Sequence, residues 1–300
     1  MSNKGTVIPP SKIDPHEDAA ALEKAMKGVE IAATYKSIYG KDLKDRLDSE
    51  LKGHFKRAVL YSFYDMAHVN ARACYKAVKG AGTDEQVLID VICTSTNEEI
   101  EALKKAYSDT HRKNLESDVK HDTAGNFEKV LVALLQGKRG KDVDDAQLRE
   151  DCEALYKGGE AVSGTDETTF TRILVTRSWN DIVKLNELYK AKYGHDLLTA
   201  IGNETSLFYK VALQTIVRTA LDKYKTYAEI LYRSMKGLGT HDDSLIRLIM
   251  AHSEVDLAVI RHTFDTTNDI SLYQMIQGDT TGDYRNYLLA ILEQEEVETY

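Results

Sequence analysis

A short glycine-containing phrase recurs three times along this chain of 300 residues and limits the folds open to it more than any other feature. The phrase stands as KGAGTDE at 79–85, as SGTDE at 163–167 and as KGLGTHD at 236–242. Each copy is followed by an aromatic residue, a leucine eight residues later and an acid after seven more. We call this set of aromatic residue, leucine and acid the frame, and a fourth copy of it occurs near the N-terminus without the glycine-containing phrase. The four frames are Tyr35, Leu43 and Glu50; Tyr107, Leu115 and Asp122; Tyr189, Leu197 and Glu204; and Phe264, Leu272 and Asp279. The chain is therefore an array of four units.

Hydrophobic periodicity predicts that these units are helical. The clearest stretch is at the end of the second unit, where Phe127, Val130, Leu131, Leu134 and Leu135 have the spacing of a strongly buried helix. All 3 prolines lie within the first fifteen residues, so nothing after them interrupts a helix through proline. We expect an all-α fold with about five short helices in each unit of ~70 residues, more than a two-helix solenoid repeat contains.

Polar residues in front of two expected helices look like N-caps. Asn97 precedes an apolar helical pattern, and Thr83 with Gln86 fits a capping box. Capping also offers a purely structural explanation of the K-G-x-G-T phrase, because glycine can end one helix and threonine can begin the next. A single copy of the phrase would favour that explanation.

The distance from each phrase to its acid favours a different explanation, a calcium site. Asp122, Glu204 and Asp279 each follow the last glycine of their phrase by 40 residues, a register for which capping gives no reason. Calcium binds six to eight oxygen atoms, which a glycine-rich turn can supply as backbone carbonyls and a distant carboxylate can complete. We expect glycine at two positions of this turn, because a side chain there would obstruct both the turn itself and the approach of a membrane headgroup.

The K-G-x-G-T phrase, the acid 40 residues beyond its last glycine and the D-T-x-G phrases at 122–125 and 279–282 resemble annexin repeats. The resemblance covers nearly the whole chain. It implies an annexin-like array of four repeats in two modules. The divisions expected are an N-terminal tail at 1–13, a truncated first unit at 14–65, a second unit at 66–137, a linker at 138–145, a third unit at 146–223 and a fourth unit at 224–300.

The same resemblance implies which atoms bind Ca2+. In the second unit they are the carbonyls of Val78, Gly80 and Gly82 with the carboxylate of Asp122. In the fourth unit they are the carbonyls of Met235, Gly237 and Gly239 with Asp279. The third unit has the longer turn GGEAVSGTDE, which is similar to an annexin variant that uses the carbonyls of Gly159, Val162 and Gly164 with Glu204. Ser163 stands where some annexins have a tryptophan that can enter the lipid interface.

The first unit is shorter than the others by about twenty residues. Met26 precedes Glu50 by 24 residues, whereas the matching intervals from Val78 to Asp122 and from Met235 to Asp279 are both 44. The loss removes the second glycine, the threonine and one whole helix. A shortened transcript or gene model and a natural degeneration both account for it. Either way, we expect a loose first unit that binds no calcium.

Charge and composition limit the function further. The formal charge of −9 argues against a nucleic-acid partner, and any contact with anionic lipid would need a bridging cation. No apolar run approaches the ~20 residues of a bilayer span and no signal peptide is visible, so we expect a cytoplasmic protein that is peripheral on membranes when calcium rises. Cys74, Cys93 and Cys152 lack metal or redox spacing and are predicted to be buried thiols.

The predicted function is calcium-dependent binding to anionic phospholipid membranes through loops on one face, with a membrane-organising or vesicle-bridging role. The alternative is a calcium-independent scaffold for protein or cytoskeletal partners, one of which could dock on the N-terminal tail. An enzyme is not expected, because the histidines are scattered without a nucleophile or metal motif, on surface or capping positions. The segment 137–145, GKRGKDVDD, is predicted to be a solvated linker, with contact between its basic cluster and lipid headgroups as the alternative.

Overall fold

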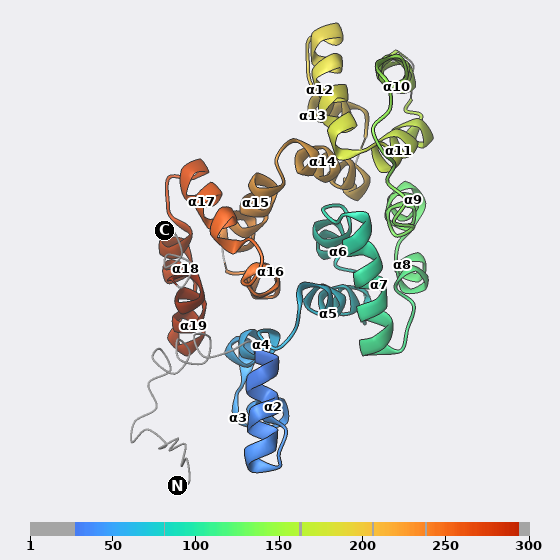
Figure 1. Ribbon diagram of the computed structural model, residues 1–300. Helices are drawn as coiled ribbons and strands as arrows, with labels where there is room; N and C mark the ends of the chain where they lie inside the picture. The colour runs from blue at the N-terminus through green and yellow to red at the C-terminus, as the bar shows by residue number, and fades with distance from the viewer. Residues whose placement is uncertain (1–27, 81, 162–163, 206, 238, 294–300) are drawn as a thin grey trace.

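The protein is all-α, as expected, over the part of the chain that the computed structural model describes (Figure 1). This part comprises residues 28–80, 82–161, 164–205, 207–237 and 239–293. It contains 18 helices and no β-strand. None of these helices is long and apolar enough to cross a membrane. The tail expected at 1–13 lies outside the described residues.

The first unit contributes three described helices, and each of the other units contributes five. Those of the first unit are α2 (Gly28–Tyr39), α3 (Leu43–Glu50) and α4 (Gly53–Tyr61). Those of the second are α5 (Met66–Val78), α6 (Glu85–Ile92), α7 (Asn97–His111), α8 (Leu115–Asp122) and α9 (Gly125–Leu134). The third has α10 (Asp145–Gly158), α11 (Glu167–Thr176), α12 (Trp179–Tyr193), α13 (Leu197–Glu204) and α14 (Leu207–Leu221). The fourth has α15 (Lys223–Met235), α16 (Asp242–His252), α17 (Leu257–Thr267), α18 (Leu272–Asp279) and α19 (Gly282–Glu293).

The leucine and the acid of each sequence frame are the two ends of one helix. In every unit this helix is 8 residues long, from the leucine to the acid. A capping side chain stands directly before each of these helices: Asp42, Asn114, Asp196 or Ser271. The seven-residue spacing is thus the length of a short capped helix, and it places each acid at a helix C-terminus.

The two predicted N-caps were each misplaced by one residue. Helix α7 is capped by Thr96, whose hydroxyl forms a capping box with Glu99, while Asn97 is already the first helical residue. Helix α6 is capped by Asp84, which accepts a hydrogen bond from the Val87 amide at 3.1 Å. Thr83 is therefore not part of a capping box, and its hydroxyl is used elsewhere.

Two large cores organise the molecule. One is continuous through the second and third units, and it includes residues from Ala71 to Val217. The other belongs to the fourth unit and takes in Ala58 from α4 of the first unit. Helix α4 packs against α16 and α19, and Figure 1 shows the first unit below the fourth at one end of the molecule. The first unit keeps a small core of its own, in which only Leu43, Val59 and Phe63 are buried.

Ion pairs cross between the two large cores. The Asp90 side chain, 2% exposed on α6, accepts two hydrogen bonds of 2.8 Å from Arg233 on α15. Arg247 on α16, also 2% exposed, lies 3.8 Å from the same carboxylate. Lys223 and Glu99 pair at 3.2 Å nearby. A buried carboxylate shared by two arginines therefore links the second unit to the fourth.

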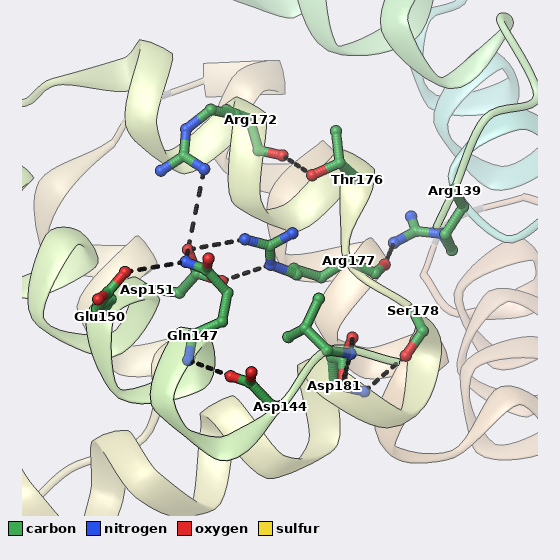
Figure 2. Close-up of polar contacts among 11 residues, drawn as sticks. Arg139, Asp144, Gln147, Glu150, Asp151, Arg172, Thr176, Arg177, Ser178 and Asp181 are labelled. Atoms are coloured by element: carbon green, nitrogen blue, oxygen red, sulfur yellow. Dashed lines mark hydrogen bonds and ion pairs between the residues drawn. The ribbon is translucent and has the colours of Figure 1, made fainter. Parts of the chain in front are cut away.

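The segment before α10 is exposed at six of its nine residues, as the prediction of a solvated linker requires, but Arg139 within it is anchored. Arg139 donates to the Leu174 and Arg177 carbonyls at 2.9 and 2.6 Å, and its guanidinium lies 3.9 Å from the centre of the Trp179 ring. Burial lowers the pKa of Arg139 to about 10. Figure 2 shows Arg139 reaching the Arg177 carbonyl, while the Arg177 guanidinium pairs with the buried Asp151. The Arg139 guanidinium is therefore engaged within the protein.

All three cysteines are buried and unpaired, as predicted. Burial raises the pKa of the Cys74 thiol to about 12, so it stays protonated at neutral pH. One histidine departs from the prediction of surface or capping positions. His252 is only 2% exposed, and its Nδ1 atom lies 2.6 Å from the Asp256 carboxylate. It is a buried partner of α17 rather than a solvated residue.

Candidate calcium sites

The loop of the second unit follows directly from the end of α5. Val78 is the last residue of this helix, and its side chain is buried while the loop after it is exposed. The chain then doubles back, and the Asp84 amide donates to the Ala77 carbonyl at 2.9 Å. The last carbonyls of a helix have no partner within the helix, and the helix dipole makes this end negative. The loop therefore begins at a helix end that favours a cation.

The loop of the fourth unit repeats this geometry closely. Gly80 and Gly82 have φ angles of 117° and 91°, and their counterparts Gly237 and Gly239 have 114° and 89°. The His241 amide closes this loop onto the Ser234 carbonyl at 2.7 Å. Two segments separated by more than 150 residues thus share their glycine φ angles and their closing hydrogen bond at the described positions, with Met235 in the place of Val78 at the helix end.

The four glycines are required by backbone conformation rather than by crowding. Positive φ angles of this kind are strained for residues that carry a Cβ atom. A methyl group added at any of the four would meet no atom of the protein within 4 Å. The expectation that a side chain would obstruct the turn itself was therefore wrong, whereas the space over the loop is open to a ligand.

A threonine joins each loop to the acid that follows it by 39 residues. The Thr83 hydroxyl donates to the Asp122 carbonyl at 2.9 Å. The Thr240 hydroxyl lies 3.2 Å from the Asp279 carbonyl and 2.8 Å from its carboxylate. Thr165 likewise donates to the Glu204 carbonyl. These hydrogen bonds explain the constant register, and they bring every predicted acid to its predicted loop.

The third loop differs from the other two in the conformation and surroundings of its first predicted glycine ligand. Gly159 has a φ angle of −121° and lies so close to the acid that an added methyl group would be 3.0 Å from Glu204 Cγ. Here glycine is needed for space. The loop closes as the others do, by the Asp166 amide donating to the Gly158 carbonyl at 2.6 Å. Gly164 has a φ angle of 94°, like Gly82 and Gly239. Val162 and Ser163 lie outside the described residues.

Glu160 fixes this longer turn, a role that sequence reasoning missed. Its carboxylate lies 2.6 Å from His195 Nε2 and accepts a hydrogen bond of 3.1 Å from the Tyr189 hydroxyl. Burial, together with this carboxylate, raises the pKa of Tyr189. Glu160 is therefore engaged in holding the loop to α12 and α13. The only signal for it in the sequence was the extra length of the turn.

Glu50, the acid of the first unit, has a different environment. It ends α3 as its counterparts end their helices, but its carboxylate pairs with Arg46 at 3.0 Å within the same helix. Met26, which marks the start of the shortened loop, lies outside the described residues. Helix α2 begins at Gly28, so no described loop reaches Glu50 in the way that Thr83 reaches Asp122.

The donor set fits a hard cation. In the described part of the chain, no three His, Cys, Asp or Glu side chains are close enough to hold a metal ion together. Any ion at these loops would therefore have to be bound mainly by backbone carbonyls, together with the carboxylate of the framed acid. Calcium accepts that combination, and it also accepts water or an external oxygen in the remaining positions, whereas zinc favours nitrogen and sulfur.

A family model and similar proteins of known sequence match this chain over most of its length. The family model described as Annexin matches residues 29–61, 69–134, 150–216 and 226–291, so its first match is about half as long as the others. Human annexin A7 is 38% identical over 313 residues, and the match covers 97% of this chain and 64% of annexin A7. This chain therefore spans less than two thirds of that relative.

Solved structures show the same architecture. Annexin III superposes with a TM-score of 0.85 at 33% sequence identity, covering 94% of each chain. A calcium-bound annexin (Sm)1 superposes with a TM-score of 0.77 at 30% identity, covering 93% of this chain and 90% of that one.

Proposed function

Because this chain belongs to the annexin family of calcium-dependent phospholipid-binding proteins, we propose that it attaches to anionic membranes through calcium sites in three of its four units. The observation that carries the proposal is the threonine hydrogen bond that holds each loop to its acid in the second, third and fourth units. The family gives no indication of an enzyme.

Each site would be built mainly from main-chain oxygens. In the second unit the carbonyls of Val78, Gly80 and Gly82 would face the ion, and Asp122 would add its carboxylate. In the fourth unit Met235, Gly237, Gly239 and Asp279 would have the same roles, which the near-identical φ angles support. Calcium needs six to eight oxygens at about 2.3–2.6 Å, so water or lipid phosphate would complete the shell.

The third site would use the carbonyls of Gly159 and Gly164, with Val162 as the expected third, and the Glu204 carboxylate. Its support is the same closing hydrogen bond and the position of Glu204 directly beside Gly159, where it leaves no free space for a Cβ atom. The first unit would bind no calcium, since Glu50 is paired with Arg46.

The cations would make membrane contact possible for an acidic protein. The chain carries a formal charge of −9, so anionic lipid repels it unless calcium intervenes. Each ion would bridge protein carbonyls and a lipid phosphate. With three sites on one body, every contact after the first is intramolecular, and the apparent affinity would rise steeply with calcium and with the content of acidic lipid.

Sedimentation with phosphatidylserine vesicles tests the proposal. We expect the protein to pellet with vesicles in calcium and to return to the supernatant when a chelator is added. The double variant Asp122→Ala with Asp279→Ala should lose most of this binding. If the wild-type protein stays in solution at millimolar calcium, or if the double variant pellets normally, the proposal is wrong. In the first case a calcium-independent scaffold with protein or cytoskeletal partners becomes the better account.

A further inference from the structure

One position in the repeat frame is occupied differently in the third unit. The residue three places after the framed acid begins the last helix of its unit, and in three units it is a glycine with positive φ. The values are 63° at Gly53, 66° at Gly125 and 62° at Gly282. In the third unit Leu207 takes this position with a φ angle of 52°. Left-handed backbone is strained for residues with a Cβ atom. The third unit therefore keeps a leucine where the fold favours glycine.

The packing of the protein gives no reason for this leucine. Leu207 is 83% exposed, more than any other large apolar residue in the described part of the chain. Its neighbour Phe208 is 40% exposed, and that ring lies 5.8 Å from the ring of Phe127 in α9. Two adjacent apolar side chains thus face solvent at the start of α14. A strained and exposed leucine costs stability and gains none from the core.

The pair lies at the third candidate calcium site. Leu207 follows Glu204 by three residues, and a methyl group added to Gly159 of the loop would lie 3.0 Å from Glu204 Cγ. Two residues further on, the Tyr209 hydroxyl donates to the Glu167 carbonyl at 2.8 Å, which ties α14 to the first residue of α11 directly after the loop. The leucine therefore begins a helix that is tied to the segment directly after the third loop, three residues from the acid of the proposed site.

We propose that Leu207, assisted by Phe208, is an apolar anchor that enters the headgroup and acyl-chain boundary of the bilayer when the third site is on a membrane. The inference rests on the proposed function. Calcium would contact only the phosphate oxygens of the lipid. Burial of a leucine in the bilayer adds a contribution to the free energy of membrane binding that does not depend on ionic strength. Ser163 provides no apolar group in this loop, so Leu207 supplies what the loop itself lacks. The occupant is lipid, because the pair adjoins the proposed lipid-binding site.

Fluorescence from the anchor position tests insertion directly. Trp179 is the only tryptophan, and it is removed first with Trp179→Phe. In that background, Leu207→Trp should give an emission maximum that shifts to the blue when calcium and phosphatidylserine vesicles are both present. Lipids brominated near the headgroup end of the acyl chain should quench it. A Phe208→Trp variant repeats the measurement at the neighbouring position. Vesicle binding with no shift and no quenching at either position overturns the inference.

Affinity provides the second test. Leu207→Gly restores the residue of the other units, so it should fold at least as well and bind calcium normally without vesicles. We expect its affinity for vesicles to fall by about threefold to tenfold, as loss of a partly buried leucine predicts. Val255→Ala is the matched control, because Val255 is 65% exposed beyond the opposite end of α16 from its loop. It should leave the affinity unchanged.

The outcomes separate the two proposals. If the wild-type protein does not bind vesicles, the proposed function itself fails. If the wild-type protein binds and Leu207→Gly binds equally well, only the anchor is wrong. A Leu207→Gly variant that loses self-association or a protein partner while keeping its vesicle affinity also overturns the anchor, and would assign the exposed pair to a protein interface.

Discussion

The first and second units share a sequence frame but differ in how deeply the residues of that frame are buried. Leu115 begins α8 and is 1% exposed within a core that continues into the third unit. Leu43 begins α3 at the matching position and is 9% exposed, in a core with only two other buried residues. The difference follows from about twenty missing residues, which would have formed the calcium loop and a covering helix.

The comparison shows that the stretch of about twenty residues missing from the first unit serves two purposes in the complete units. Its removal takes away the glycine loop, and with it the partner of the framed acid, so Glu50 pairs with Arg46 instead. It also uncovers the neighbouring helices. The first unit persists because α4 is shared, with Ala58 fully buried in the core of the fourth unit. Helix α2 makes its main contacts with α3.

The largest expected difference between the two units is in calcium binding. Asp122→Ala removes the carboxylate assigned to the ion of the second unit, so calorimetric titration with calcium should count one site fewer than in the wild-type protein. Glu50→Ala changes the equivalent acid in a unit without a loop, and it should leave the number of sites unchanged. A clear fall in stoichiometry for Glu50→Ala would show that the first unit retains a site.

Core truncation should show the next largest difference. Leu115→Ala removes a fully buried side chain from a core that cannot collapse around it, so we expect a loss of about 3–5 kcal/mol in the free energy of unfolding. Leu43→Ala acts on a smaller and partly exposed core, and the loss should be about 1–2 kcal/mol. Urea unfolding followed by circular dichroism measures both. Equal losses would mean that the first unit is as well packed as the second.

The sequence was sufficient for the architecture because the architecture repeats. Each frame from leucine to acid proved to be one capped helix, and the constant distance from glycine to acid proved to be a threonine hydrogen bond. What could not be predicted depended on contacts between distant segments. Thr83 could cap a helix or reach Asp122, and only the folded chain decides which. The burial of Arg139 requires α11 and Trp179 beside it. The exposure of Leu207 has no signature in a single sequence, and its positive φ was indicated only by the glycines at the same frame position in the other units.

Removal of the hydroxyl from the tyrosine that begins each frame should show a smaller difference in stability between the two units. Tyr107 is fully buried, and its hydroxyl donates to the Asp118 carboxylate at 2.7 Å. Burial, reinforced by this carboxylate, raises the pKa of Tyr107. Tyr107→Phe should therefore cost about 1–2 kcal/mol, because it removes a hydrogen bond to a charged group. Tyr35, its counterpart on α2, is only half-buried, and Tyr35→Phe should change the stability by less than about 0.5 kcal/mol. Unfolding midpoints that fall equally would contradict this ranking.

The smallest expected effect concerns pH and the residue four places after each of these tyrosines. In the first unit it is Tyr39, which is 52% exposed, whereas in the second it is His111, whose ring stacks on Tyr75 with centroids 3.9 Å apart. Burial, with a contribution from Arg72, lowers the pKa of His111. A histidine with a lowered pKa binds its proton more tightly in the unfolded chain, so folding loses stability as the pH falls through about 6.5, the ordinary value of the unfolded state.

The variant His111→Asn cannot bind this proton, so it isolates that contribution. The stability difference between the wild-type protein and His111→Asn should be largest at pH 7.5, where the ring is neutral in both states, and it should shrink by pH 5.5. Urea unfolding at the two pH values measures it. Because the first unit has no histidine at this position, Tyr39→Asn should shift the stability equally at both pH values. A constant difference for His111→Asn would show that the ring is solvated in the second unit as well, and that the two units differ less than their cores indicate.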